Sequence, residues 1–273
     1  MCFVLDFHFN LFYWLHEKQI TMANWTREQT IIALSVYCKI PFNRASNTNP
    51  EIVAAARLIG RSPVAVKMKV GNFGSFDPEL KARGIVGLSN TSKLDEEIWN
   101  EYSKDWERLA YDSERIKAEL EHKSIEENSG IDLTTLPEGK DREVVIKQRI
   151  NQSFFRAAVL TSYNNRCCIS GLSCVDLLEA CHIVDWSNDT ENRLNPSNGI
   201  CLNVLFHRAY DRNYIGITPD YRVIVSERLM DESGNDKMKS YFKQYDNTTM
   251  RMPDRFMPNK DLLAIHYNKF KNQ

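Results

Sequence analysis

The residues best suited to chemistry in this sequence lie between Arg166 and Thr218 and include two histidines and an aspartate. Histidine has an unperturbed pKa close to neutrality, so His182 can act as a general base that takes a proton from water. His207 and Asp211 are four residues apart, and on a helix they would share one face. These residue types predict a site in which a base activates water.

Short elements on either side of a polar loop must bring these residues together. The apolar run 175–183 predicts a strand that ends beside the first histidine, and 200–202 predicts a second short strand. Between them, residues 187–198 are rich in turn formers. Helical spacing over 203–211 predicts a helix that carries the second histidine.

The order and setting of these residues resemble the HNH endonuclease family, and most closely its restriction endonuclease-like branch. The matching pieces are His182 in Ala180-Cys181-His182-Ile183, Asn198 in Asn198-Gly199 and His207 in His207-Arg208-Ala209-Tyr210-Asp211. The resemblance continues upstream through Arg149, Gln152, Phe154, Phe155, Arg156, Tyr163, Cys167 and Gly171.

The resemblance implies a ββα-metal fold that holds one divalent cation. It gives His207 to the metal and Asn198 to the loop that braces the site. Asp211 is then a further ligand or a hydrogen-bonding partner of His207, because metal-bound imidazoles usually donate their second N–H to such a group. A cation and a general base together suit phosphodiester hydrolysis, with His182, Asn198 and His207 as the catalytic set.

One position departs from the family pattern. Many HNH enzymes carry a metal-binding aspartate immediately before the base histidine, where this chain has Cys181. A thiolate would suit zinc better than magnesium, whereas an unligated cysteine would be a small buried residue. We expect Mg²⁺ or Mn²⁺, with Zn²⁺ or Ni²⁺ as alternatives, and Cys181, His207 and Asp211 as candidate ligands.

The remaining cysteines favour no structural zinc ribbon, because none of the seven forms a CxxC pair. Free cysteines without an export signal are typical of a cytoplasmic protein. The aromatic-rich residues 1–21 are too short and too polar for a confident membrane span. We interpret them as an upstream extension, with a hydrophobic anchor as the alternative.

Charge is distributed unevenly although the chain carries a net charge of only -1. Residues 24–95 hold ten Lys and Arg against five acids, and residues 142–273 hold eighteen against fifteen. The segment 96–141 between them has six basic residues and fourteen acids. Two basic ends around an acidic middle are the pattern that phosphate contact needs.

Residues 22–92 predict a helix-turn-helix-like DNA-binding domain. Thr26 or Asn24 can cap a first helix, Asn49-Pro50 opens a second and Ser62-Pro63 a third. The alternatives are a small helical bundle with a solvated charged face, or a surface for a partner subunit. The candidate nucleic-acid contacts are Arg61, Lys67 and Lys69 here, and Arg149, Arg156 and Arg208 nearer the histidines.

Residues 93–141 predict a charged spacer, with one long helix over 93–127, followed by a linker over 128–141. Apolar residues recur at helical intervals over 93–127, which indicates a packing seam or a homodimer arm. They are Ile98, Tyr102, Trp106, Leu109, Ile116 and Leu120. Residues 142–273 then form the nuclease domain, where the arginines of 142–163 contact either phosphates or acids of the same domain.

The sequence therefore predicts an α+β protein with an N-terminal helix-turn-helix-like domain, a helical spacer and a C-terminal ββα-metal domain. The expected substrate is double-stranded DNA, with or without modified bases, and the family implies a restriction or defence role. One alternative is a DNA-binding regulator with an inactive HNH-like fold. Another is a nuclease for RNA or structured DNA.

Overall fold

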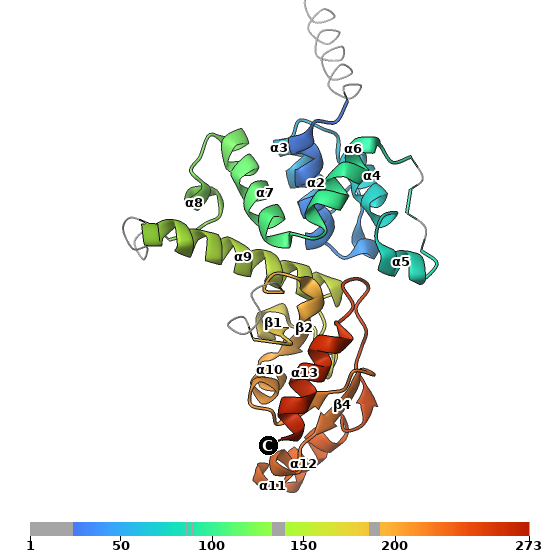
Figure 1. The fold of residues 1–273 in the computed structure, drawn as a ribbon, viewed down its shortest axis with the longest axis vertical. Helices are drawn as coiled ribbons and strands as arrows, with labels where there is room; N and C mark the ends of the chain where they lie inside the picture. The colour runs from blue at the N-terminus through green and yellow to red at the C-terminus, as the bar shows by residue number, and fades with distance from the viewer. Residues whose placement is uncertain (1–23, 86, 89, 133–139, 186–191, 273) are drawn as a thin grey trace, which may run out of the picture.

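The computed structural model describes residues 24–272 apart from 86, 89, 133–139 and 186–191. The expectations for 1–21 and for most of the linker before residue 141 lie outside the described residues. Figure 1 shows a group of helices above the long helix α9, with the strands and the remaining helices below it. No helix in the described ranges is long and apolar enough to cross a membrane.

The upper group, residues 24–132, is called here the helical half. Its elements are α2 (Arg27–Lys39), η1 (Phe42–Arg44), α3 (Pro50–Leu58), α4 (Pro63–Gly74), α5 (Pro78–Ala82), α6 (Lys93–Tyr102), α7 (Trp106–Glu121) and α8 (Ile125–Asn128). Thr26, Asn49 and Ser62 cap α2, α3 and α4 with their side chains, so the predicted starts of these helices are confirmed within a residue. The three helices contact one another, but DNA binding by this unit stays a prediction.

The prediction of one helix over 93–127 is wrong. The chain breaks between α6 and α7, where Asp105 accepts a hydrogen bond from Arg108 N and restarts the helix. The predicted apolar seam is present, but Ile98, Leu109 and Ile116 are buried in the core that α2 also enters. These side chains are therefore covered within the chain, and they do not form the surface that a homodimer arm would need.

The helix α9 (Lys140–Ser162) belongs to two cores at once. Ile150 and Phe154 lie in the core of the helical half, whereas Phe155 and Val159 lie in a second core. Since successive helical residues point about 100° apart, neighbouring side chains of one turn can enter different cores. This helix is the main connection between the two parts of the molecule.

The second core belongs to residues 163–272, called here the sheet half. Its elements are η3 (Val175–Leu177), β1 (Leu178–His182), η4 (Pro196–Asn198), β2 (Gly199–Asn203), α10 (Val204–Asp211), β3 (Ile215–Ile217), β4 (Arg222–Val225), α11 (Glu227–Glu232), α12 (Asp236–Lys243), β5 (Thr248–Thr249) and α13 (Lys260–Lys271). β1 pairs antiparallel with β2, and β3, β4 and β5 form a separate antiparallel sheet. The α+β class and the predicted strand, loop, strand, helix order are confirmed.

A segment of the sheet half also returns to the helical half. Arg255 is fully buried and donates hydrogen bonds to the carbonyl oxygens of Tyr37 and Ile40. Met257 N donates to the Glu79 carboxylate at 2.9 Å. The pattern of the sequence did not predict this contact, because Tyr37 and Ile40 lie 218 and 215 residues before Arg255.

Candidate active site

Pairing of β1 with β2 places His182 at the end of a short hairpin-like unit. His182 lies opposite Gly199 in the ladder, and Cys181 lies opposite Ile200. A Cβ atom at residue 199 would come within 2.4 Å of Val159 Cγ2 and 2.8 Å of Phe155 Cζ, so only glycine fits between the strand and α9. The Asn-Gly pair therefore lets α9 approach the strand beside the histidine.

The imidazole of His182 is held on two sides. Its ring stacks on Phe155 with centroids 4.0 Å apart and planes 3° apart. Its Nε2 lies 3.0 Å from the Arg193 carbonyl oxygen, and because a carbonyl can only accept, Nε2 carries the hydrogen. The neutral ring then has its lone pair on Nδ1, which is the atom able to take a proton.

Burial lowers the pKa of His182, although the bond to the Arg193 carbonyl acts in the opposite direction. The neutral form of the ring is therefore favoured at neutral pH. A general base must be unprotonated before it reacts, so this environment suits the predicted role of His182.

Asn198 is fully buried and braces the chain that follows β1. Its Oδ1 accepts from Val184 N at 2.9 Å, and its Nδ2 donates to the carbonyl oxygens of Val184 at 3.1 Å and Asn192 at 3.2 Å. Asn192 immediately precedes Arg193, whose carbonyl holds His182. Asn198 thus supports the base without a contact to it, in the bracing position that the resemblance implies.

The helix α10 presents His207 and Asp211 toward β1. His207 Nδ1 lies 2.5 Å from Glu179 Oε2, and His207 Nε2 lies 3.5 Å from Asp211 Oδ2. The Glu179 carboxylate fixes the hydrogen of His207 on Nδ1, since a carboxylate accepts. Nε2 is left with the lone pair that a metal ion would take.

Cys181 completes this cluster from the adjacent strand. Its Sγ lies 3.9 Å from Asp211 Oδ1, and the ligand atoms of Cys181, His207 and Asp211 all lie within 4.8 Å of one another. Burial, followed by the charge of Asp211, raises the pKa of the Cys181 thiol well above its usual value. Cys181 thus has features of a small buried residue and of a candidate metal ligand, because its thiol is buried and also lies in the cluster.

The side chains of this cluster would be stabilised by a divalent cation. Glu179 and Asp211 have no Lys or Arg ion-pair partner in the part of the chain that the structure describes. Two carboxylates beside a histidine lone pair would be stabilised by positive charge. The nitrogen and oxygen ligand atoms suit Mn²⁺ and similar divalent metal ions, and the sulfur of Cys181 shifts the metal preference of the cluster toward Zn²⁺.

The predicted nucleic-acid contacts fall into two groups. Lys67, Arg156 and Arg208 are exposed on α4, α9 and α10. Arg208 follows the candidate ligand His207, and Arg156 follows the residue that stacks on His182. Arg149 is half-buried at a separate pocket.

Arg61 and Lys69 are placed differently from the prediction, because both are buried and bonded. Arg61 donates to Gln29 Oε1 at 2.9 Å and to the Asn24 carbonyl at 2.8 Å. Lys69 Nζ lies 2.5 Å from Asp95 Oδ1 in an ion pair whose side chains are 6% and 0% exposed. A lysine committed to a buried acid stabilises the fold and does not reach a phosphate.

Glu179 and Phe155 are the site residues that lacked a predicted role. A signal for Glu179 was available, because it stands two residues before Cys181 and alternate residues of a strand share a face. Phe155 was named only as part of the family resemblance, without a role at the site. Its contact with the imidazole depends on the crossing of α9 over the strand, which no local pattern encodes.

The family comparison agrees with this geometry. Residues 167–218 match the family model described as HNH endonuclease, and the match contains Cys181, His182, Asn198, His207 and Asp211. No curated protein matches the chain. Residues 167–218 therefore form a domain of the HNH endonuclease family, and such a domain implies nuclease activity on nucleic acid.

Proposed function

We propose that the protein is a metal-dependent endonuclease that hydrolyses DNA phosphodiester bonds in a restriction or defence role. The observation that carries the proposal is the adjacency of two sets of groups on one strand. His182 is held as a neutral base, and the residue before it joins His207 and Asp211 in a cluster of ligand atoms within 4.8 Å. Hydrolysis of a phosphodiester needs both sets, a base for water and positive charge for the phosphate.

His182 acts as the general base through Nδ1. The Arg193 carbonyl and the Phe155 ring fix the tautomer and the plane of the imidazole, so the lone pair is directed before substrate arrives. A water molecule beside Nδ1 loses its proton as it attacks phosphorus, and the bond to the leaving oxygen breaks. The fixed ring limits the reorganisation that this step requires.

Cys181, His207 and Asp211 would hold the divalent cation. When bound, the cation supplies positive charge that stabilises the phosphate and the departing 3′ oxygen. Glu179 orients His207 by accepting from Nδ1, and this arrangement typically strengthens a metal-binding imidazole. Mg²⁺ or Mn²⁺ are the expected ions, and Zn²⁺ or Ni²⁺ are alternatives favoured by the sulfur.

DNA is the proposed substrate because of the basic side chains around the site. Arg156 and Arg208 are exposed beside residues of the candidate site, and Lys67 is exposed on α4. Such side chains suit contacts to phosphates, which position a duplex without reading its sequence. The restriction role rests on the family resemblance alone.

The test is cleavage of plasmid DNA, unmodified or carrying methylated or hydroxymethylated cytosine, with Mg²⁺, Mn²⁺, Zn²⁺ or no metal. We expect metal-dependent cutting by the wild type and cutting at least about 10²-fold slower by His182→Ala. Single-stranded RNA and branched DNA are included as rival substrates. Binding without cutting, by folded protein in every metal, would instead support a regulator with an inactive HNH fold.

A further inference from the structure

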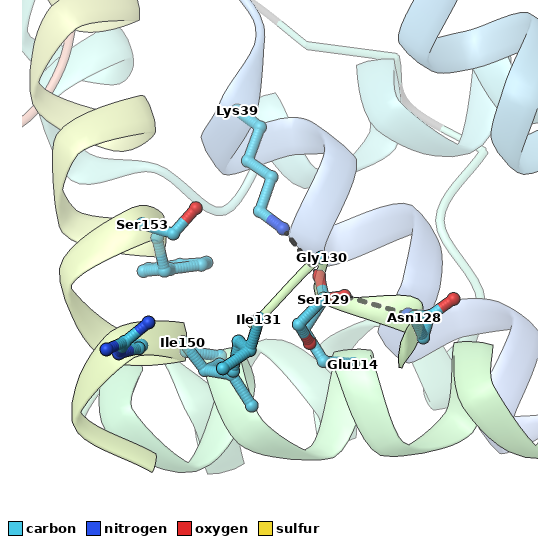
Figure 2. A pocket seen from close by; sticks show the side chains of 11 residues that line it. Lys39, Glu114, Asn128, Ser129, Gly130, Ile131, Ile150 and Ser153 are labelled. Carbon is cyan, nitrogen blue, oxygen red and sulfur yellow. Dashed lines mark hydrogen bonds and ion pairs between the residues drawn. The ribbon is translucent and has the colours of Figure 1, made fainter. Parts of the chain in front are cut away.

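A pocket of about 340 Å³ lies in the angle between α2, α7, the chain after α8, and α9, within the helical half. Figure 2 shows Lys39 reaching from α2 toward Glu114 of α7, with Ser129 and Ile131 beside them and Ile150 and Ser153 on α9. Its volume falls in the range of about 300–1,000 Å³ that small-molecule sites occupy. None of the candidate catalytic residues lines it.

The pocket wall contains a carboxylate that two ammonium groups share. Lys39 and Arg149 line it together with one carboxylate, Glu114. Glu114 Oε1 already accepts from Lys39 at 3.0 Å and from Lys117 at 2.8 Å, and its Oε2 accepts from Asn128 at 3.1 Å. One carboxylate is thus shared by two ammonium groups, and a further anion would be attracted there.

The pKa of Lys39 reflects first its burial and then a neighbouring cation. Burial lowers the pKa of Lys39, and the neighbouring Lys117 lowers it further, against the opposing effect of Glu114. An ammonium has three N–H donors, and Glu114 is its acceptor among the described residues. A bound anion would supply the missing acceptors and restore the usual pKa.

Another polar atom of the wall lacks a partner. Ser129 Oγ is buried and has no hydrogen-bond partner among the described residues. Buried polar groups are rarely left in this state, so each such case needs an explanation. Ile131, Ile150 and Phe154 add an apolar side to the same pocket. The lining therefore offers cations and hydroxyls together with an apolar surface.

From these features we propose that the pocket binds a phosphate monoester with an aromatic ring, of the nucleoside monophosphate class, and that its occupancy fixes α9 beside the active site. A phosphate monoester carries up to about two negative charges and three acceptor oxygens, which match two cations and a hydroxyl better than a carboxylate does. The face of the aromatic ring would lie against the apolar side.

The connection to the active site runs through two consecutive residues. Phe154 lines the pocket and contacts Lys39, whose Nζ lies 5.7 Å from the ring centroid. Phe155 stacks on His182 at 4.0 Å. A shift or rotation of α9 that adapts Phe154 to a ligand also moves Phe155, so the ligand biases the orientation of the base. This part rests on the proposed function.

Binding is tested first, by calorimetry with AMP, GMP, CMP and UMP, and with adenosine and inorganic phosphate as partial probes. We expect one or more monophosphates to bind more tightly than either partial probe. Ser153→Trp fills the pocket from an exposed helical position and should weaken binding at least tenfold. The matched control is Gln148→Trp, on an exposed position of α9 outside the lining.

Two results would overturn the site. One is the absence of binding by every monophosphate at millimolar concentration, and the other is equal binding by Ser153→Trp and wild type. Lys39→Met gives a second check, with Lys147→Met as its control, because Lys147 pairs with Glu107 at 2.8 Å outside the pocket. Tight binding of single-stranded nucleic acid that Ser153→Trp also abolishes would instead assign the pocket to the substrate and overturn the small-ligand proposal.

Coupling to the base is read by the NMR signal of the His182 ring, assigned with His182→Ala. The bound monophosphate should shift this signal in wild type and not in Ser153→Trp, whether or not the protein cuts DNA. In a cutting enzyme the same ligand should change the cleavage rate several-fold. Binding without a change in the His182 signal would overturn the coupling, while failure to cut would overturn only the proposed function.

Discussion

The helical half and the sheet half bring charged side chains together in opposite ways. In the helical half, Lys69 meets Asp95 in a pair whose side chains are 6% and 0% exposed. In the sheet half, Glu179 and Asp211 gather around His207, and neither acid has a Lys or Arg partner among the described residues. The first pair is neutralised within the protein, and the second cluster leaves acids that a cation would neutralise.

This difference separates structural from functional ion clusters. A buried pair with matched charges costs desolvation energy, but each charge has its partner. Removal of one member therefore leaves the other charge buried and uncompensated. A cluster of acids around a histidine is incomplete and gains stability from a ligand. Four substitutions or titrations, taken from the largest expected effect to the smallest, test whether the distinction holds.

The largest effect is expected for His182→Ala. Removal of the base should lower the cleavage rate by about 10²–10⁴-fold, the usual contribution of general-base catalysis. Binding of Mn²⁺, measured by calorimetry on the same variant, should stay within a few-fold of wild type because the ligand cluster is untouched. Unchanged cleavage at saturating metal would remove His182 from the mechanism.

Asp95→Ala tests the complete type of cluster. The substitution leaves the Lys69 ammonium buried without its acid, and we expect a loss of about 3–5 kcal/mol in the free energy of unfolding. Urea unfolding measures it. The control is Glu97→Ala, which breaks an exposed pair with Lys93 at 3.8 Å and should cost less than about 1 kcal/mol. Equal losses in both variants would contradict the structural role of the buried pair.

Glu179→Gln tests the incomplete type. Glu179 is 43% exposed, so the fold should tolerate the change, but His207 loses the carboxylate that orients it. We expect the affinity for Mn²⁺ to fall about 10–100-fold, as for other carboxylates that support a metal-binding histidine. Glu227→Gln, an exposed acid on α11, serves as the control. A wild-type affinity in Glu179→Gln would mean that the carboxylate plays no part in metal binding.

His266 provides the smallest effect and a contrast with both clusters. It is 7% exposed, stacks on Tyr210 at 3.6 Å, and burial lowers its pKa from 6.5 to about 4. The unfolded chain therefore takes up a proton before the folded protein does, so this stabilisation is complete above pH 6.5 and falls as the pH drops toward 4. The loss should reach about 2 kcal/mol at pH 5.

Urea unfolding of wild type and His266→Phe between pH 5 and 8 measures this effect. Phenylalanine keeps a ring on Tyr210 but cannot be protonated, so the dependence attributed to His266 should disappear in the variant. Identical pH profiles for both proteins would show that another group is responsible. Metal-free protein is used throughout, so that the ligand cluster does not contribute through bound ions.

The sequence predicted the local features of the site well. The order of His182, Asn198 and His207, the strand before the first histidine and the helix under the second are all set by short-range patterns. The four-residue spacing of His207 and Asp211 also placed them on one face, as the 3.5 Å separation confirms. Each of these depends on residues close together in the chain.

What could not be predicted depends on distant partners. Lys67 and Lys69 stand on the same helix, but one is exposed and the other meets an acid 26 residues later. The count of charged residues in the sequence assigned both lysines to nucleic-acid contact. The break between α6 and α7 was hidden because Ile98 and Leu109 kept helical spacing across it, and Arg255 gave no signal that it would be fully buried.

The shared helix α9 and the buried Arg255 have a consequence for how the protein unfolds. Ile150 and Phe155 anchor α9 in different cores, and Arg255 ties the sheet half to carbonyl groups at the end of α2. Cutting the chain before residue 142 would expose Ile150, which packs in the core of the helical half, and would leave the Arg255 guanidinium without these carbonyl acceptors. The two halves should therefore melt in a single cooperative transition, and the nuclease portion expressed alone should be much less stable than the same residues in the full chain.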